Sequence, residues 1–289
     1  MNPLLSQQEK DCLESFRRYV RSVYHDEFGV ENEAMENFVA EDWFFCDERH
    51  EHRIAEVRHR LPAARRILDL ASGMGTAALY ALSQGFDAFG IEPDSRKLQF
   101  TRERIDAGGM SAEWRSRFQR AVGEHLPFRN DSFDVILSYQ TLEHVQDEAR
   151  VLHEMLRTIR SGGGLYIRCP DYRGTYEGHY LLPWLPWMPR KLAWIYLRML
   201  GRPLVGFEGI RYATRKGIVK TLRRLEKGTL GMRLEILDLD RERFLRRLAE
   251  KKLPVWGWAY PFWKGFRYGR DLFRRELHVD LWVFVHKRR

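Results

Sequence analysis

The chain has 289 residues, of which 44% are hydrophobic and 31% charged, and its formal net charge is +9 at pH 7. This composition is typical of an ordered globular protein and argues against a long disordered arm. The N-terminal residues turn polar too early for a secretory signal, and no run of about 18 apolar residues predicts a membrane-spanning helix. Three widely spaced cysteines form neither a disulfide framework nor a metal-ligand pattern. We therefore expect a cytoplasmic protein that holds no metal.

Hydrophobic spacing predicts the order of the elements. Helices are expected from Gln7 to about His25 and from Glu51 to Leu61, so we interpret residues 1–61 as a helical extension of a domain at 62–289. In that domain the sequence predicts strands at 66–70, 88–91, 118–122, 133–138, 165–169, 234–237 and 277–286, and helices at 77–84, 95–107, 148–160 and 215–225. The segment Ser161-Gly162-Gly163-Gly164 is expected to end the helix at 148–160. This alternation predicts a doubly wound, Rossmann-like α/β fold with a seven-stranded, mostly parallel sheet whose last strand is antiparallel.

Two segments, at about 171–212 and 241–276, interrupt this alternation and are rich in aromatic and basic residues. They are too long for simple connections, so we interpret them as inserted lids or substrate-facing elements. Tryptophans beside Lys and Arg side chains are typical of a segment that lies in a membrane interface, but they also suit the core of a lid. The basic residues toward the carboxyl end favour an anionic partner or a solvated face. Both alternatives stay open at this point.

A glycine-containing turn follows the predicted strand at 66–70 and reads as G-x-G-x-x-A, a permitted form of the dinucleotide fingerprint. Asp69 distinguishes this turn from a dinucleotide site, because a carboxylate there would repel a pyrophosphate. The acid would instead attract a ligand that carries sulfonium and ammonium groups, while Gly73 and Gly75 let the backbone approach it. Glu92, at the end of the next strand, is placed to accept hydrogen bonds from ribose hydroxyls. The electrostatics therefore favour S-adenosylmethionine over NAD.

The segments 67–75, 90–94, 124–136 and 142–145 resemble the motifs of class I S-adenosylmethionine-dependent methyltransferases of the type 11 subgroup, and 161–164 is similar to the later glycine-rich turn of that subgroup. The resemblance covers roughly residues 60–170. It implies a Rossmann-like fold, S-adenosylmethionine as cofactor, and a cofactor site formed by Asp69, Ala71, Ser72, Gly73, Gly75, Glu92, Pro93, Glu124, His125 and Gln140. The chain departs from the family pattern at Ala71, where a glycine is common, and at Val122, where an acid commonly contacts the adenine.

Methyl transfer to an oxygen needs alignment of the reactants and a residue that takes the proton of the acceptor. We expect the catalytic residues at the carboxyl ends of the fourth and fifth strands, with His179 as the favoured base and His144 and Tyr139 as further candidates. The acceptor is expected to be a small molecule or a lipid or saccharide, such as a lipid-linked saccharide at the inner membrane face. RNA methylation is an alternative, although no appended RNA-binding motif or Asn/Asp-Pro-Pro-aromatic motif is present. A non-catalytic nucleoside-binding scaffold is another.

Overall fold

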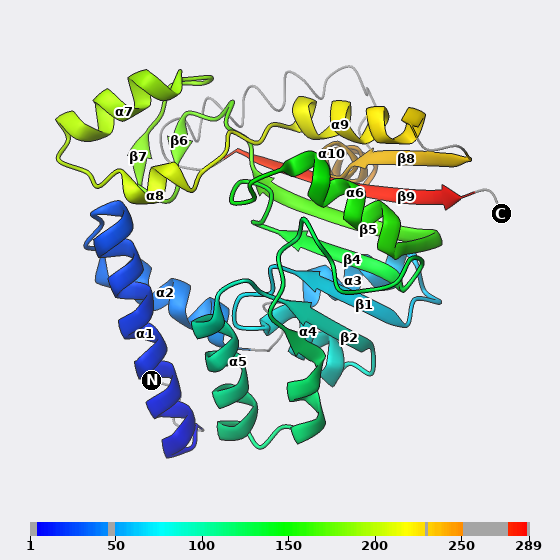
Figure 1. Cartoon of the computed structure of the whole chain (residues 1–289), viewed down its shortest axis with the longest axis horizontal. Coiled ribbons are helices and arrows are strands. Elements are labelled where there is room, and N and C mark those ends of the chain that lie inside the picture. The colour runs from blue at the N-terminus through cyan, green and yellow to red at the C-terminus, as the bar shows by residue number, and fades with distance from the viewer. Residues whose placement is uncertain (1–4, 46–49, 229–230, 251–276, 288–289) are drawn as a thin grey trace.

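The structure is a twisted sheet covered by helices on both faces (Figure 1). A computed structural model gives the structure of residues 5–45, 50–228, 231–250 and 277–287. The sheet has seven strands in the order β3-β2-β1-β4-β5-β9-β8. Their bounds are β1 Arg66–Leu70, β2 Asp87–Ile91, β3 Phe118–Gln119, β4 Phe133–Tyr139, β5 Ile159–Pro170, β8 Met232–Asp238 and β9 His278–Lys287. The first five are parallel, and β9 runs antiparallel to both of its neighbours. This architecture confirms the predicted fold class.

Strand order reverses between β1 and β4, because the chain leaves β1 for β2 on one side and later returns to place β4 on the other. Open α/β sheets bind their ligands outside the carboxyl ends of the strands at such a switch point. All side chains of β4 from Phe133 to Ser138 are buried, and so are four of the five in β1. Buried parallel strands of this kind leave their carboxyl ends as the open edge of the sheet.

The helices divide between the two faces of the sheet. On one face α6 (Glu148–Thr158) and α9 (Arg215–Gly228) pack their apolar stripes on the strands. The other face is covered by α3 (Glu51–Arg60), α4 (Thr76–Ser83), α5 (Ser95–Ala107) and α10 (Leu239–Glu250). A 3₁₀ helix at Ala112–Arg117 leads into β3. Side-chain caps start α5 and α6, where Asp94 accepts from the Arg96 N–H and Asp147 accepts from the Arg150 N–H.

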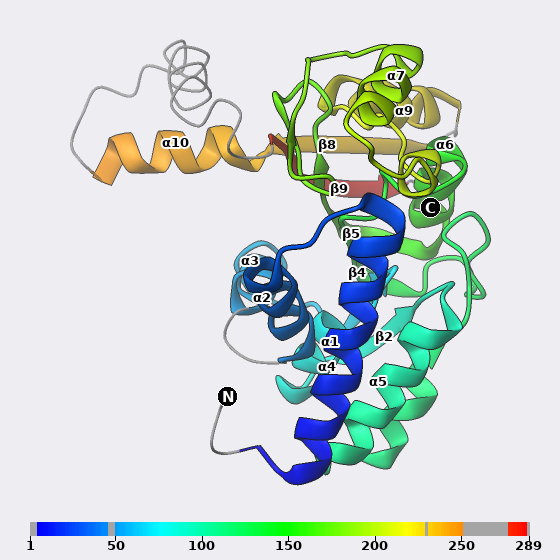
Figure 2. The ribbon, with the colours of Figure 1, turned by 90° about the vertical axis from the view of Figure 1, so that its left-hand side faces the viewer.

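The N-terminal extension lies beside the carboxyl ends of the parallel strands (Figures 1 and 2). It contains α1 (Gln7–Phe28), which starts with a capping box and ends at Gly29, and α2 (Glu33–Phe44). Both helices pack with α5 in one apolar cluster that includes Phe16 and Phe100. The buried Arg104 of α5 donates to the carbonyls of Trp43 and Phe44 and so fixes the end of α2. The extension is thus attached to the sheet domain beside the switch point.

The segment 171–212 folds into a hairpin of β6 (Tyr176–Glu177) and β7 (Leu182–Pro183), followed by α7 (Arg190–Met199) and α8 (Val205–Glu208). Its core includes Trp184, Leu197 and Phe207, and it packs on Phe28 at the end of α1. Part of the predicted aromatic set therefore forms the core of this insertion, whereas Trp187 is exposed. The segment 241–276 begins inside α10, and residues 251–276 lie outside the described residues. None of the described helices combines the length and the apolar character needed to cross a membrane.

The Ser-Gly-Gly-Gly segment at 161–164 does not end a helix as predicted. Helix α6 stops at Thr158, and the glycines lie inside β5. Ile159 pairs with Phe133, and the register then shifts, so that Val135 pairs with Gly164. A Cβ on Gly163 would lie 2.7 Å from the carbonyl oxygen of Asp134, so only glycine fits this irregular pairing. The predicted helix over 148–160 is therefore present but ends two residues early, at Thr158, and only its predicted glycine stop was wrong, because the glycines serve a bulge in the strand.

Gly75 precedes α4 with a φ of +70°, and a Cβ there would lie 2.5 Å from Cε1 of Phe118 and 2.9 Å from Cγ2 of Thr101. We expect Gly75→Ala to destabilise the protein through both backbone strain and overpacking. Gly85, with a φ of +84° and no atom of the described residues within 4 Å of a built Cβ, is a matched control for strain alone. Urea unfolding should give Gly75→Ala an extra loss of about 1–3 kcal/mol over Gly85→Ala. Equal losses would contradict the packing role of Gly75.

Candidate functional site

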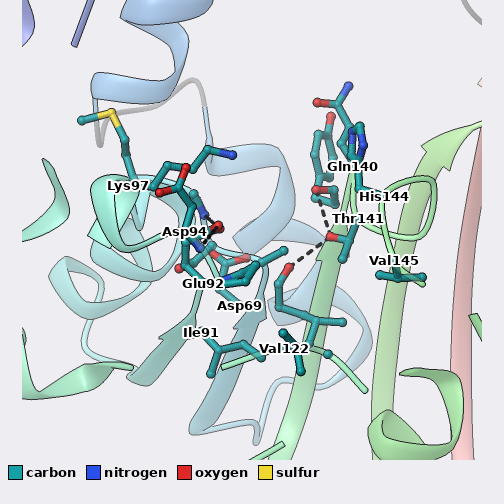
Figure 3. Close-up of a pocket in the computed structure, with 18 of the residues that line it drawn as sticks. Asp69, Ile91, Glu92, Asp94, Lys97, Val122, Gln140, Thr141, His144 and Val145 are labelled. Atoms are coloured by element: carbon teal, nitrogen blue, oxygen red, sulfur yellow. Dashed lines mark hydrogen bonds between the residues drawn. The ribbon is translucent and has the colours of Figure 1, made fainter. Parts of the chain in front are cut away.

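A cavity of about 980 Å³ opens at the carboxyl ends of β1, β2 and β4. It is lined by the predicted residues Asp69, Ala71, Ser72, Gly73, Glu92, Pro93, Glu124, His125 and Gln140, and by the three predicted catalytic residues Tyr139, His144 and His179. Figure 3 shows Asp69, Glu92 and Asp94 on one side of the pocket and Gln140, Thr141 and His144 on the other. Its size is that of a site for a small molecule or cofactor. Residues that are far apart in the sequence thus meet in one cavity.

The turn after β1 takes a left-handed backbone at Ala71, Gly73 and Gly75, with φ values of +57°, +56° and +70°. The Ser72 N–H donates to the Ile91 carbonyl, and this bond ties the turn to β2. Alanine in this conformation costs about 1–2 kcal/mol, which gives a physical reason why glycine suits position 71. A Cβ on Gly73 would meet no described atom within 4 Å. Gly75 does not line the cavity but packs against Phe118 behind it, so its predicted role in backbone approach is replaced by a packing role.

Asp69 places a carboxylate at the end of β1, and it is almost completely buried. Burial raises the pKa of the Asp69 carboxyl to about 6, whereas the Arg53 charge and the Ala78 N–H at the start of α4 lower it. These opposing effects leave the charged form desolvated and only partly compensated. A cationic group of a ligand in the cavity would supply the missing compensation.

Glu92 follows β2 and is also buried. One carboxylate oxygen accepts from the Gly73 N–H at 2.8 Å and the other accepts from the Asp94 N–H at 3.1 Å. Asp94 in turn accepts from the Tyr19 hydroxyl of α1 at 2.8 Å. Glu92 therefore braces the glycine turn in addition to lining the cavity. Each carboxylate oxygen has a second lone pair, so the predicted bonds to ribose hydroxyls remain compatible with this bracing.

Glu124 and Gln140 are held by the backbone around them. One Glu124 oxygen accepts from the N–H groups of Gln146 and Asp147, just before α6. Gln140 has a φ of +53°, and its N–H donates to the Arg168 carbonyl at 2.7 Å. Such a left-handed conformation for a residue other than glycine is strained and is found most often at functional sites.

His144 and His179 meet in the cavity although 35 residues separate them. Their Nε2 atoms are 3.3 Å apart, and Nδ1 of His179 lies 2.7 Å from a Glu177 oxygen. Glu177 is buried and also accepts from the Tyr172 hydroxyl and the Tyr180 N–H. An ionised carboxylate accepts only, so Nδ1 of His179 carries its proton, and its Nε2 accepts from Nε2–H of His144.

Tyr139 ends β4 with two guanidinium groups close to its ring. The Cζ of Arg53 lies 3.7 Å from the ring centroid and that of Arg168 lies 5.5 Å from it. Arg53, from α3, also lines the cavity, and its Nε is buried without a hydrogen-bond partner among the described residues. A cation thus stands near the buried Asp69 carboxylate.

The helical extension and α5 add residues to the cavity wall that sequence patterns did not predict as part of a site. They are Tyr19, Val20, Val23, Tyr24, Glu27, Phe28, Trp43, His50, Arg53 and Lys97. Periodicity predicted two helices in the extension but carried no signal for the surface that they cover. His50 accompanies Arg53, and burial followed by the Arg53 charge lowers the pKa of His50 to about 4. Among the described residues, no group of three or more His, Cys, Asp or Glu side chains is arranged to hold a metal ion.

Residues 68–167 match a family model described as a methyltransferase domain. This segment is a type 11 methyltransferase domain. It includes the glycine turn, Glu92 and His144, and S-adenosylmethionine is the cofactor of this class. The methyltransferase domain fits that cofactor on three observations: the buried Asp69 carboxylate, the open space at Gly73, and the unpartnered Nε of Arg53.

Curated relatives are similar to the chain over less than half of its length. The chain is 36% identical over 118 residues to an uncharacterized methyltransferase of Mycobacterium sp. (strain KMS), which covers 41% of this chain and 44% of the relative. It is 34% identical over 116 residues to methyltransferase GfsG of Streptomyces halstedii, with 40% and 41% covered. The chain therefore spans less than half the length of these curated relatives.

Solved structures of methyltransferases are similar at low identity. A possible histamine N-methyltransferase of Thermotoga maritima has a TM-score of 0.45 at 17% identity, with 96% of this chain and 100% of that chain covered. Phosphoethanolamine N-methyltransferase 2 of Haemonchus contortus has a TM-score of 0.46 at 18% identity, with 82% and 52% covered.

The raised pKa of Asp69 has a consequence for stability. Above pH 6 the folded protein carries a desolvated charge, and as the pH falls through 6 toward 3.8 the folded state binds a proton before the unfolded chain does. Asp69→Asn removes that charge, so we expect it to raise the free energy of unfolding of the cofactor-free protein at pH 7 by about 1–3 kcal/mol. Urea unfolding between pH 4 and 7.5 should show this gain shrinking as the pH falls from about 6 toward 4.

Asp11→Asn, at an exposed position of α1, is the control for removal of an acid, and it should leave the pH profile close to that of the wild type. A gain from Asp69→Asn that stays the same at every pH would contradict the assigned cause.

Proposed function

We propose that this chain is an S-adenosylmethionine-dependent methyltransferase that methylates a hydroxyl of an amphiphilic acceptor, such as a lipid-linked saccharide, in the cytoplasm at the membrane face. The observation that carries this proposal is a single cavity in which the Asp69 and Glu92 carboxylates lie with the hydrogen-bonded pair of His144 and His179. The proposed cofactor-binding residues and the candidate base therefore line the same cavity. This is the arrangement that a methyl transfer to oxygen requires.

The cofactor, when bound, supplies a methyl group on a positively charged sulfur. Asp69 would hold its ammonium group, because the buried carboxylate is incompletely compensated in the cavity. The cationic Arg53 would pair with its carboxylate. Glu92 would accept from the ribose hydroxyls, and Val122 offers the adenine an apolar contact in place of the acid that is common in the family.

The base would act through both histidines. Nδ1 of His144 takes the proton of the acceptor hydroxyl, and the Nε2–H of His144 points toward Nε2 of His179. Passage of that second proton would place the positive charge on His179, next to the buried Glu177 carboxylate. Glu177 would then be a positioning residue that fixes the tautomer of His179 and stabilises its charged form. Tyr139 would contact the substrates from the end of β4.

Two features support an amphiphilic acceptor. The insertion that contributes His179 to the cavity also exposes a group of large apolar side chains, among them Trp187 and Met199. In addition, the wall formed by α1 is largely apolar or aromatic, with Val20, Val23 and Phe28. An acceptor with a polar end at the histidines and an apolar portion against these surfaces would match both.

The electrostatics of the cavity predict which cofactor binds. Calorimetry should give S-adenosylmethionine a dissociation constant at least about tenfold lower than that of NAD, and Asp69→Asn should weaken its binding by about 10- to 100-fold because a charge-assisted hydrogen bond is lost. Glu36→Gln, which alters a buried acid that does not line the cavity, is the control and should leave the affinity unchanged. Tighter binding of NAD would overturn the proposal.

Methyl transfer itself can be followed by mass spectrometry of a lipid and glycan extract incubated with the protein and an isotope-labelled methyl donor. We expect one species to gain one labelled methyl group on a hydroxyl. His179→Asn should lower the rate of incorporation by about 10²- to 10⁴-fold while leaving cofactor affinity unchanged, since the pair of His144 and His179 acts on proton removal and not on cofactor binding.

His153→Asn is the matched control, because His153 lies on α6 with its side chain half exposed and does not line the cavity. It should retain the wild-type rate. Label on nitrogen or carbon alone, or a His179→Asn rate equal to that of the control, would contradict the proposed acceptor chemistry.

A further inference from the structure

The insertion at 171–212 exposes an unusual concentration of apolar side chains. Ten large hydrophobic residues are exposed among the described residues, and eight of them lie in this one segment: Leu185, Trp187, Leu192, Trp194, Ile195, Met199, Leu200 and Val205. The other two, Phe38 and Val122, lie elsewhere in the chain. Single exposed hydrophobic residues need no explanation, but a group of this size on one segment indicates an interaction surface.

Helix α7 has two apolar faces, and only one of them is used in folding. Ala193 and Leu197 are buried in the core of the insertion. Leu192, Ile195 and Met199, at positions i, i+3 and i+7, form a second stripe that faces solvent. Because Trp184 and Leu197 already fill the core, the exposed stripe is not required to hold the insertion together. The exposed stripe therefore rests on the packed core of the insertion and faces solvent.

The charges on α7 itself have one sign. The segment Arg190–Met199 contains no acidic residue, and Lys191 and Arg198 are exposed beside the apolar side chains. The guanidinium carbon of Arg198 lies 5.0 Å from the Trp194 ring centroid. Arg190 instead donates to the carbonyls of Phe207 and Ile210 within the insertion, so its charge does not add to this exposed surface.

Helix α9 adds positive charge on the same upper side of the molecule as α7 in both views, although Figure 1 shows the two helices separated along the long axis (Figures 1 and 2). Its exposed basic residues include Lys216, Lys220 and Arg224. Cations beside exposed aromatic and aliphatic side chains match a surface with negative headgroups over an apolar layer. A neutral protein partner would leave the cations unpaired, and a partner that offers only acidic groups would leave the apolar stripe uncovered.

We propose that residues 185–205, with α7 at their centre, dock this protein onto an anionic phospholipid bilayer. The apolar stripe enters the interface between headgroups and acyl chains, while Lys191, Arg198 and the basic residues of α9 contact the phosphates. His179 belongs to the same insertion, and its hairpin shares a packed core with α7 through Tyr180, Trp184 and Leu197. The inference rests on the membrane location in the proposed function, which it deepens by naming the docking surface and the lipid charge, but it does not depend on methyl transfer.

Vesicle flotation of the full chain tests this docking. With vesicles of phosphatidylcholine and phosphatidylserine at 70:30, the wild type should float, and with phosphatidylcholine alone the floated fraction should fall at least about tenfold. With the anionic vesicles, the floated fraction of the double variant Trp187→Ser/Met199→Glu should be at least about tenfold smaller than that of the wild type. Phe38→Glu, a similarly exposed position on α2, is the matched control and should float like the wild type.

Each outcome decides for or against the proposal. Wild-type protein that stays in the soluble fraction with anionic vesicles overturns it, as does a double variant that floats like Phe38→Glu. Light scattering that shows a dimer which the double variant dissociates would assign the stripe to a second copy of the chain instead. Calorimetry with S-adenosylmethionine on the double variant should give the wild-type affinity, which separates loss of docking from misfolding. Docking without methyl transfer would leave this inference standing and reject only the proposed activity.

Discussion

The arrangement of this protein depends on one buried carboxylate at the end of its first strand. Asp69 stands where a parallel strand covered on both faces reaches the open edge of the sheet, and desolvation there raises the pKa of its carboxyl to about 6. The glycine turn that follows keeps side chains away from the acid, and α4 begins with an N–H group near it. Arg53, delivered by α3, compensates the charge from outside the sheet. A carboxylate held in this way is destabilising by itself, and its burial is explained by a cationic ligand that shares the cavity.

The remaining parts of the cavity are fixed by reference to that turn. Glu92 grips the turn through the Gly73 N–H, and Asp94, two residues later, receives the Tyr19 hydroxyl of α1. The helical extension is thus bonded to the same loop that shapes the cofactor site, while Arg104 secures the end of α2. A displacement of the extension would shift the glycine turn, because hydrogen bonds link Tyr19 to Asp94, Asp94 to Glu92 and Glu92 to Gly73. The extension is therefore part of the site and not a separate attachment.

Much of this arrangement could be predicted from the sequence, and the exceptions have physical reasons. Strand β1 and helix α5 have the predicted bounds because a buried apolar run and an Asp94 cap are local signals. Asp69 and Glu92 were predicted to follow two successive parallel strands. The carboxyl ends of such strands lie together at one end of the sheet, so the two acids meet there. The glycine run in β5 was misassigned because a bulge and a helix cap demand the same residue type. The contact of Glu177 and His179 with His144, and the entry of Arg53, depend on how an insertion and an extension pack, which no local pattern encodes.

The insertion connects the chemistry of the cavity to the outer surface through one small core. Trp184, Tyr180 and Phe28 pack together beneath the hairpin that carries Glu177 and His179, and Phe28 stacks on the His179 ring itself. Helix α7 packs on the same core through Ala193 and Leu197 and exposes a separate apolar stripe that contributes nothing to this packing. Exposure of that stripe costs free energy that folding does not recover, and the docking proposed above would recover it. Because one core supports both the histidine hairpin and α7, the proposed docking surface and the proposed base are parts of the same packed unit.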